Sequence, residues 1–244
     1  AILNADDDLV SNMGRNLDCK VAYFSLDENN PLIKSHCENG GLAAILENGF
    51  VTICKGTWKL RVHKVINIPL TFSGKAVFMI QNILPAILSA FIRNFKIEDI
   101  RLALETFIPS PVQTPGRMNM FQFKKFTVMV DYAHNPAGFQ AIARFLEKVD
   151  AKPKVGVIAL GTLAAKMFDE IIIRQDRNLR GRTEQEIIDF MLEGIKAVDP
   201  SKPVKVIPLE KEAIDYVIKN GKKGAFIVIC SDVIPDALDQ IMKY

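Results

Sequence analysis

The polar residues best suited to chemistry lie where an apolar segment gives way to a helical pattern. Residues 126–130 are apolar and β-branched enough to form a strand, and an amphipathic helix pattern starts at residue 137. Ligands of open parallel sheets bind beyond the carboxyl ends of the strands, and free amides at a helix start suit phosphate or other anions. We therefore expect Asp131, His134 and Asn135, which lie between the two segments, at a ligand site.

A second group of charged residues follows the apolar segment 170–173, and consists of Arg174, Asp176, Arg180 and Arg182. Arginines bind carboxylates through paired hydrogen bonds, and an aspartate binds an ammonium group. Such a group can hold an amino acid with its amine free to attack. A solvated loop with surface ion pairs is the alternative interpretation, and the residues alone do not decide between the two.

The elements that must position these residues form an α/β pattern. Alternation after residue 121 predicts βαβ units and a parallel sheet with helices on both faces. The expected strands of this part are 126–130, 155–158, 170–173, 204–207 and 225–229, and the expected helices are 137–149, 160–168, 184–198, 211–219 and 234–242.

The first half of the chain reads differently. Strands are expected at 2–3, 21–25, 42–46, 50–54 and 58–65, the last three with hairpin-like turns, and helices from about 75 and over 97–107. Pro85 should kink the first of these helices or mark a later start. The proline-rich stretch 107–121 is the expected boundary, which gives domains 1–109 and 110–244.

Composition narrows the possible partners. The net charge of +3, from 31 basic and 28 acidic residues without a long basic block, argues against nucleic acid. The segment 76–92 is apolar but includes Gln81, Asn82 and Pro85 and is too short for a membrane span, so we expect a buried helix and no membrane partner. The four cysteines occur singly, which indicates the reduced thiols of a cytoplasmic protein and no metal site.

Several segments together resemble the cyanophycin synthetase family within the Mur ligase superfamily. They are NADD at 4–7, the strand at 20–25, the pattern from KG to NIL at 55–84, TPGRMNMF at 114–121, DYAHNPAG at 131–138 and FDEIIIRQDRNLRGR at 168–182. The resemblance implies that residues 1–109 are the second half of an ATP-binding central domain with a mixed sheet and helices. Residues 110–244 would then be a Rossmann-like α/β C-terminal domain.

The resemblance also assigns roles to residues. It implies ATP contacts from Asn82, through the adenine, and from Arg117, Asp131, Tyr132, His134 and Asn135. It implies that Arg174, Asp176, Arg180 and Arg182 belong to a loop that binds the incoming amino acid. Taken alone, Asn82 is more typical of a satisfied core amide and Arg117 of a solvated loop. His134 is as typical of a helix-capping or ion-paired histidine as of a ligand contact. No catalytic residue is identified.

The implied reaction is ATP-dependent amide formation with Mg²⁺ on the phosphates. ATP would phosphorylate a carboxylate of a growing poly-aspartate polymer, and an amino acid, arginine by family analogy, would attack the acyl phosphate. The partners would be the amino acid and the polymer or peptide substrate, and the sequence is compatible with a homo-oligomer.

The chain departs from the superfamily pattern because it has no GxxxxGK[ST] phosphate-binding loop. This polypeptide alone should not hydrolyse ATP, and we expect the loop upstream of Ala1. Two alternatives stay open: a catalytically incompetent Mur-like binding or assembly module, and a peptidoglycan-precursor or folylpolyglutamate ligase. A hydrolase is disfavoured, because no GxSxG motif accompanies Asp131 and His134 and the nearest serine or cysteine in sequence is Ser110.

Overall fold

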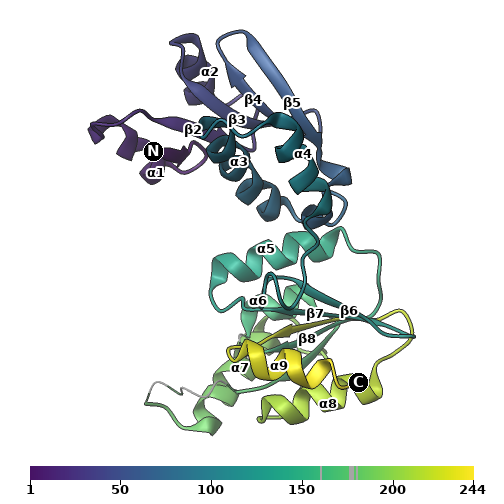
Figure 1. Cartoon of the computed structure of the whole chain (residues 1–244). Helices are drawn as coiled ribbons and strands as arrows, with labels where there is room; N and C mark the ends of the chain where they lie inside the picture. The colour runs from purple at the N-terminus through teal and green to yellow at the C-terminus, as the bar shows by residue number, and fades with distance from the viewer. Residues whose placement is uncertain (160, 176–178, 180) are drawn as a thin grey trace. The chain divides into compact units, whose positions relative to one another are not determined.

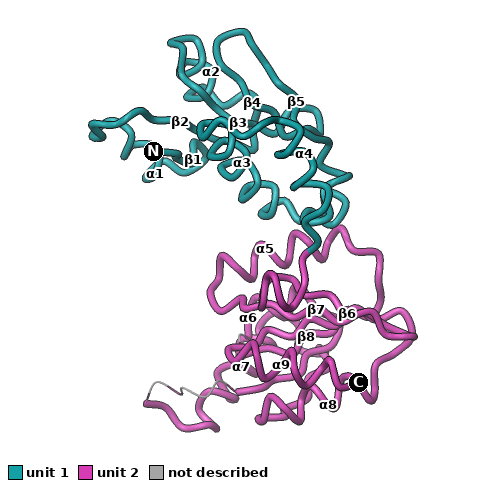
Figure 2. The backbone as a smooth tube through the Cα atoms, in the orientation of Figure 1, with its two compact units in different colours: residues 1–108 teal, residues 109–244 magenta. Residues whose placement is uncertain are grey.

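The chain divides into two compact units, residues 1–108 and residues 109–244 (Figure 2). The computed structural model describes residues 1–159, 161–175, 179 and 181–244. Asp176 and Arg180, two of the predicted substrate residues, therefore lie outside the described residues. The α/β class expected from the sequence is confirmed in both units.

Unit 1 is built on a five-stranded mixed sheet in the order β1-β2-β3-β4-β5. The first three strands are parallel, and β3, β4 and β5 form an antiparallel meander. The strands are β1 (Ile2–Asn4), β2 (Ala22–Ser25), β3 (Leu42–Glu47), β4 (Phe50–Lys55) and β5 (Trp58–Lys64). The helices are α1 (Asp8–Met13), α2 (Pro31–Glu38), α3 (Val77–Ile92) and α4 (Ile97–Thr106), with 3₁₀ turns at Gly14–Asn16, Val65–Asn67 and Pro69–Thr71.

Helix α3 forms the core of unit 1 with the sheet. Six of its apolar side chains are buried, and they pack with strand residues such as Ile53 and Val62. Pro85 lies inside this helix, which runs unbroken from Val77 to Ile92, so the expected later start is wrong. Burial of a whole apolar face outweighs the local cost of one proline.

Unit 2 contains a six-stranded sheet in the order β10-β9-β8-β11-β7-β6. Its strands are β6 (Asn119–Gln122), β7 (Thr127–Asp131), β8 (Lys154–Ile158), β9 (Glu170–Ile173), β10 (Val204–Val206) and β11 (Phe226–Cys230). Its helices are α5 (Pro136–Glu147), α6 (Thr162–Met167), α7 (Glu184–Val198), α8 (Glu210–Asn220) and α9 (Ile234–Ile241). All pairs are parallel except β6 with β7.

The helices cover the two faces of this sheet. Helices α8 and α9 pack on one face, where Ile214 and Leu238 meet Val128, Val157 and Ile227. Figure 1 shows α5 and α6 on the opposite side of the sheet from α8 and α9. The loops after β8 and β11, two neighbouring strands, therefore lead to opposite faces, and such a switch point is where ligands bind in open α/β sheets.

The structure adds two elements that the sequence patterns did not predict. Helix α2 begins after Asn30, whose side-chain oxygen accepts hydrogen bonds from Leu32 N and Ile33 N at 2.9 and 3.3 Å. Strand β6 starts near the end of the stretch expected to be a linker, after its prolines, and it pairs antiparallel with β7 at the edge of the sheet. The second half is therefore not a purely parallel sheet. No helix among the described residues is long and apolar enough to cross a bilayer.

Candidate functional site

Asp131 ends β7 and is 7% exposed. Its Oδ1 accepts a hydrogen bond from Ala133 N at 2.8 Å, and its Oδ2 accepts one from Met118 N at 3.0 Å. Burial raises the pKa of this carboxyl, while the bonded amides and the charge of Arg117 act in the opposite direction. The carboxylate thus fixes the loop after β7 to the segment that precedes β6.

Asn119, the first residue of β6, is fully buried and bonds the turn that precedes this strand. Its Oδ1 accepts from Gly116 N at 2.7 Å, and its Nδ2 donates to Thr114 O at 2.9 Å. The turn that these bonds close needs a glycine, because Gly116 has a φ of +69° and an added Cβ would lie 2.6 Å from Ile234. The sequence analysis missed Asn119, because neither its burial nor the strand that it begins was evident from the sequence.

Three of the residues predicted to bind the nucleotide lie close to one another near Asp131 and Asn119. The guanidinium carbon of Arg117 lies 5.8 Å from the centre of the Tyr132 ring, and that ring lies 4.6 Å from the His134 ring. Nδ1 of His134 is 2.9 Å from Tyr132 O. Arg117 and His134 are exposed, and within the described part of the chain Arg117 forms no ion pair. We call Arg117, Tyr132 and His134 the exposed cluster.

Asn135 caps helix α5. Its Oδ1 accepts from Gly138 N at 2.8 Å, and Pro136 occupies the first helical position. The amide thus starts the helix directly beside the exposed cluster. Its predicted nucleotide contact stays a prediction.

Arg174, which follows β9, is 3% exposed and bonded on every side. Nε and Nη2 donate to Cys230 O at 3.0 and 2.6 Å, and Nη1 donates to Gln175 O at 3.2 Å and to Asp232 at 2.9 Å. These bonds join the ends of β9 and β11. The predicted contact with a substrate carboxylate stays a prediction, and the guanidinium has a structural task at this place. We call Asn119, Asp131 and Arg174 the buried braces.

Glu210, the first residue of α8, completes the Arg174 network and was not predicted. Its Oε1 accepts from Ser231 Oγ at 2.8 Å. Its Oε2 lies 3.2 Å from Nε of Arg174 but accepts no hydrogen bond from a described residue, because Nε donates to Cys230 O. Burial raises the pKa of this carboxyl, and the charge of Arg174 opposes the rise.

The one cysteine of unit 2 also lies at this edge. Burial, and then the charge of Asp131, raise the pKa of the Cys230 thiol. A protonated buried thiol is a poor nucleophile. This is consistent with the absence of a hydrolase motif.

Arg182 lies at the start of α7 and is exposed. Its guanidinium carbon lies 5.0 Å from the centre of the Phe190 ring. The adjacent Thr183 caps the helix in a reciprocal pair with Glu186. Arg182 is thus the predicted substrate residue, among those described, whose guanidinium is open to solvent.

Asn82 belongs to unit 1. It is exposed on α3 and lines a pocket of about 240 Å³ between α3, α4 and the turn Pro69–Thr71. Among the lining residues it is the polar one, and the others are apolar side chains such as Leu70, Leu104 and Phe107. Among the described residues its amide donates only to Met79 Sδ, at 4.0 Å.

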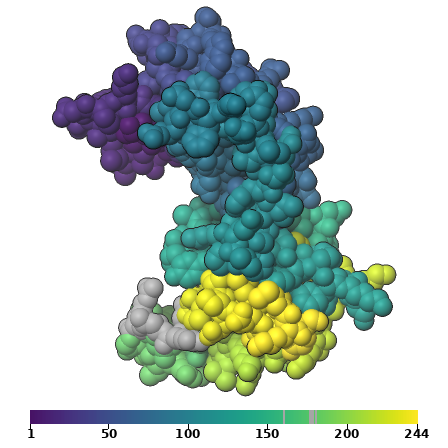
Figure 3. Space-filling model, in the orientation of Figure 1, coloured from purple at the N-terminus to yellow at the C-terminus, as the bar shows by residue number. Residues whose placement is uncertain are grey.

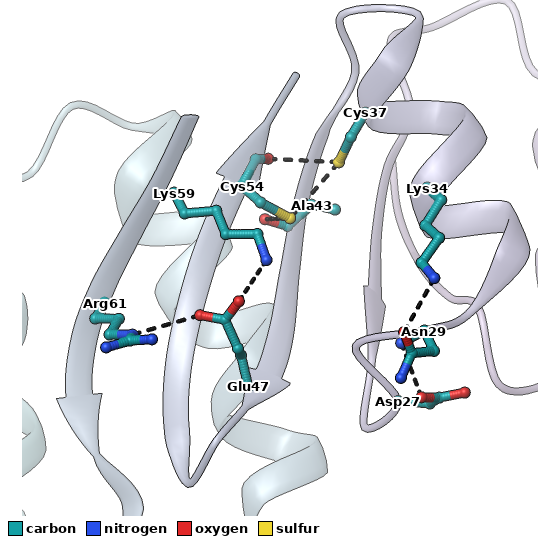
Figure 4. A network of polar contacts seen from close by, with 9 residues as sticks. All are labelled: Asp27, Asn29, Lys34, Cys37, Ala43, Glu47, Cys54, Lys59 and Arg61. Carbon is teal, nitrogen blue, oxygen red and sulfur yellow. Dashed lines mark hydrogen bonds and ion pairs between the residues drawn. The ribbon is translucent and has the colours of Figure 1, made fainter. Parts of the chain in front are cut away.

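The other polar network of unit 1 is structural (Figure 4). Glu47 is buried, pairs with Lys59 and lies 3.4 Å from Nε of Arg61, and the Lys59 hydrogen bond lowers the pKa of Glu47. Beside it, Sγ of Cys37 lies 3.5 Å from Sγ of Cys54, and burial raises the pKa of Cys54 to about 12. None of the predicted ligand residues belongs to this network.

Comparisons with known proteins agree with these elements. The family model of the Mur ligase glutamate ligase domain matches residues 116–233. A cyanophycin synthetase of Geminocystis herdmanii is 41% identical over 255 residues, which cover 100% of this chain and 29% of that protein. The chain is a Mur-like module related to the cyanophycin synthetases. The resemblance found in the motifs is confirmed.

More distant matches are to other ligases. A UDP-N-acetylmuramoyl-L-alanyl-D-glutamate–2,6-diaminopimelate ligase of Caldanaerobacter subterraneus is 31% identical over 166 residues, 63% of this chain and 33% of that protein. MurF from Acinetobacter baumannii has the same fold, with a TM-score of 0.65 at 16% identity, covering 100% of this chain and 52% of that one.

A folylpolyglutamate synthase of Mycobacterium tuberculosis, solved with ADP and AMPPCP, aligns with a TM-score of 0.59 at 16% identity, covering 97% of this chain and 52% of that one. At such identities the likeness shows the fold. The Mur-like module spans less than a third of the length of the cyanophycin synthetase that it matches.

Proposed function

We propose that this Mur-like module is part of an ATP-dependent amide ligase of the cyanophycin synthetase type, acting in the cytoplasm. In the reaction, the γ-phosphoryl group of ATP passes to a carboxylate and gives an acyl phosphate and ADP. The amine of an amino acid then attacks the acyl carbon, and phosphate leaves with the bonding electrons. Arginine is the proposed amino acid, and a poly-aspartate chain is the proposed carboxylate donor.

The observation that carries the proposal is the exposed cluster at the carboxyl end of β7. Arg117 has no ionic partner among the described residues, and its guanidinium lies against the ring of Tyr132. A guanidinium fork matches phosphate oxygens, and the aromatic neighbour limits the rotamers that must be ordered on binding. The N-terminus of the adjacent helix α5 adds backbone amides, which also favour a negatively charged phosphate.

The pocket at Asn82 fits the base of the nucleotide. Its walls are apolar, and the amide of Asn82 offers both a donor and an acceptor to a base edge. We assign residues 1–108 to the second half of the ATP-binding central domain and residues 109–244 to the C-terminal domain.

We propose Arg182, together with the neighbouring segment 174–182, as the acceptor site. Arg182 is exposed at the carboxyl side of the sheet, where a carboxylate could approach it. Arg174 would act as a positioning residue, since its donors hold Cys230 O and Asp232.

Magnesium is the proposed partner of the ATP phosphates. Within the described ranges no group of three His, Cys, Asp or Glu side chains is placed to hold a metal ion. In phosphoryl-transfer sites Mg²⁺ is held mostly by phosphate oxygens and water, with one or two carboxylates, so we derive no step through Mg²⁺ from the residues of this module.

The decisive experiment measures amino-acid-dependent ADP formation by a ligase that contains this module. Arg117→Ala should raise the KM for ATP by about 10- to 100-fold, the loss of one charge-assisted hydrogen bond. Arg144→Ala, an exposed arginine in the last turn of α5, is the matched control and should leave the KM unchanged. An unchanged KM in Arg117→Ala would remove Arg117 from the nucleotide site.

The same assay tests the other functions. A module that only binds or supports assembly would show no ADP formation with any amino acid. Turnover with diaminopimelate or glutamate in preference to arginine or lysine would indicate a peptidoglycan-precursor or folylpolyglutamate ligase.

A further inference from the structure

Three loops lie side by side at the amino ends of the central strands of unit 2, on the edge opposite the candidate site. They are residues 123–126 before β7, residues 148–154, which end at the first residue of β8, and residues 219–225, which run from the end of α8 to the start of β11. Gly224 N donates to Lys125 O at 2.8 Å, and Phe226 N donates to Pro153 O at 2.9 Å. Figures 1 and 3 show the turn between β6 and β7 beside the loop before β11. We call these three segments the amino-edge loops.

The amino-edge loops concentrate positive charge. They contain eight lysines and one acidic residue, Asp150, so that their net charge is +7. The lysines are Lys124, Lys125, Lys148, Lys152, Lys154, Lys219, Lys222 and Lys223. The rest of the chain holds 23 basic and 27 acidic residues, net −4. The small overall charge thus conceals a strongly basic edge, which appears only when the fold joins the three segments.

Most of this charge is not neutralised. Lys222 pairs with Glu170, and Nζ of Lys219 lies 3.9 Å from Asp215. Among the described residues the other six lysines form no ion pair. Seven of the eight lysines are exposed, and Lys154 is half-buried. Lysines held together without counter-charges repel one another, and an anionic partner would relieve this repulsion.

We propose that the amino-edge loops bind a flexible acidic polypeptide, a chain with closely spaced carboxylates. Lysines are compact charges that suit dispersed carboxylates, whereas phosphate recognition favours arginine forks, and the amino-edge loops contain no arginine. Bases would also need free aromatic faces, but the rings of Phe123 and Phe126 stack on each other at 5.0 Å.

The amino-edge loops lie at the opposite edge of the sheet from the candidate site, so a chain bound to them would not cover that site. A five-residue strand spans about 17 Å, so the amino-edge loops and the residues after β7 are separated by roughly that distance. A sufficiently long acidic chain could bind at the amino edge while another part of it reached the opposite edge, which would raise its effective concentration there. The binding proposal itself does not depend on the proposed ligase activity.

Fluorescence anisotropy with labelled poly-L-aspartate tests the proposal on the full chain at low ionic strength. The variant Lys125→Gln/Lys223→Gln should bind about fivefold more weakly, from two exposed charge pairs. The control Lys196→Gln/Lys211→Gln removes the same charge from exposed positions of α7 and α8, and should change the affinity by less than about twofold. Lys125→Arg/Lys223→Arg keeps the charge and should bind as the native chain does.

Salt provides a second readout, since binding should weaken as the ionic strength rises. An equal loss in the two glutamine variants would overturn the proposal, as would no binding at low ionic strength. A single-stranded DNA oligonucleotide that bound through Lys125 and Lys223 more tightly than poly-L-aspartate would replace the acidic polypeptide with a nucleic acid as the partner.

Discussion

The buried braces and the exposed cluster lie at the same edge of the unit 2 sheet but are built differently. Asn119, Asp131 and Arg174 are 0%, 7% and 3% exposed, and their polar atoms bond backbone groups of other segments. Arg117 and His134 are exposed and have few partners. From this difference we predict that substitutions in the buried braces change mainly the stability of unit 2, and that substitutions in the exposed cluster change mainly ligand binding.

Arg174→Ala is the strongest test of this division. It would leave the carboxylates of Asp232 and Glu210 without their cation and Cys230 O without its donors. We expect the free energy of unfolding of unit 2 to fall by about 3–5 kcal/mol, as for other buried pairs that lose one partner.

Chemical denaturation followed by circular dichroism would measure this loss, with fluorescence of Trp58, the single tryptophan, reporting unit 1 separately. Arg182→Ala is the matched control and should cost less than about 0.5 kcal/mol, because its side chain is exposed. If Arg174→Ala lowered the free energy of unfolding only slightly, the Arg174 network would not be needed for stability. Binding of the substrate would then be the better explanation of Arg174.

Asn119→Ala tests the second brace. It would leave Gly116 N and Thr114 O without their side-chain partner, and we expect a loss of about 2–3 kcal/mol in the same denaturation experiment. Gln122→Ala, at an exposed position of the same strand, should change stability by less than about 0.5 kcal/mol. If Asn119→Ala kept full stability, the turn before β6 would not depend on this amide.

Arg182→Ala tests whether an exposed arginine of unit 2 binds the amino acid, and the ligase assay measures its effect. We expect the KM for the amino acid to rise by about 10- to 100-fold, the loss of one charge-assisted hydrogen bond, with the KM for ATP unchanged. Equal effects on the two constants would contradict the acceptor assignment. Arg180→Ala should behave in the same way, although Arg180 lies outside the described residues.

The sequence predicted where polar residues would gather but not which of them would be buried. The strand patterns located Asp131 and Arg174 at strand ends, because alternation of apolar segments is a local property. The partners of Arg174, Cys230 O and Asp232, lie 56 and 58 residues away in sequence, and only the insertion of β11 between β7 and β8 brings them near. A charged run after a strand looks the same whether it braces the fold or faces solvent.

The remaining differences have similar physical origins. Pro85 has a poor local propensity for a helix interior, but six buried side chains of α3 override it. The edge strand β6 follows a proline-rich stretch and is only four residues long, so its pairing with β7 leaves little periodic signal. The amino-edge loops were missed because each contributes only a few lysines, while their sum depends on strand order.

Glu210→Gln gives the smallest expected effect and tests whether the charge inside the brace network is costly. Burial holds the folded pKa of Glu210 above its usual value of 4.5, so its ionised form weakens the folded state at neutral pH. As the pH falls through the folded pKa towards 4.5, the folded state takes up the proton first and the native chain regains stability. Glutamine does not titrate, yet its oxygen can still accept from Ser231 Oγ.

The stability of the native chain minus that of the variant should therefore increase as the pH is lowered from 7 to 4.5. Denaturation curves at several pH values would measure the difference, with Glu212→Gln, an exposed neighbour on α8, as the control for the loss of one carboxylate. A difference that decreased towards acid would mean that Arg174 stabilises the Glu210 carboxylate by more than its burial costs. The brace would then be held together by charge, and Arg174→Ala should cost more at pH 7 than at pH 4.5.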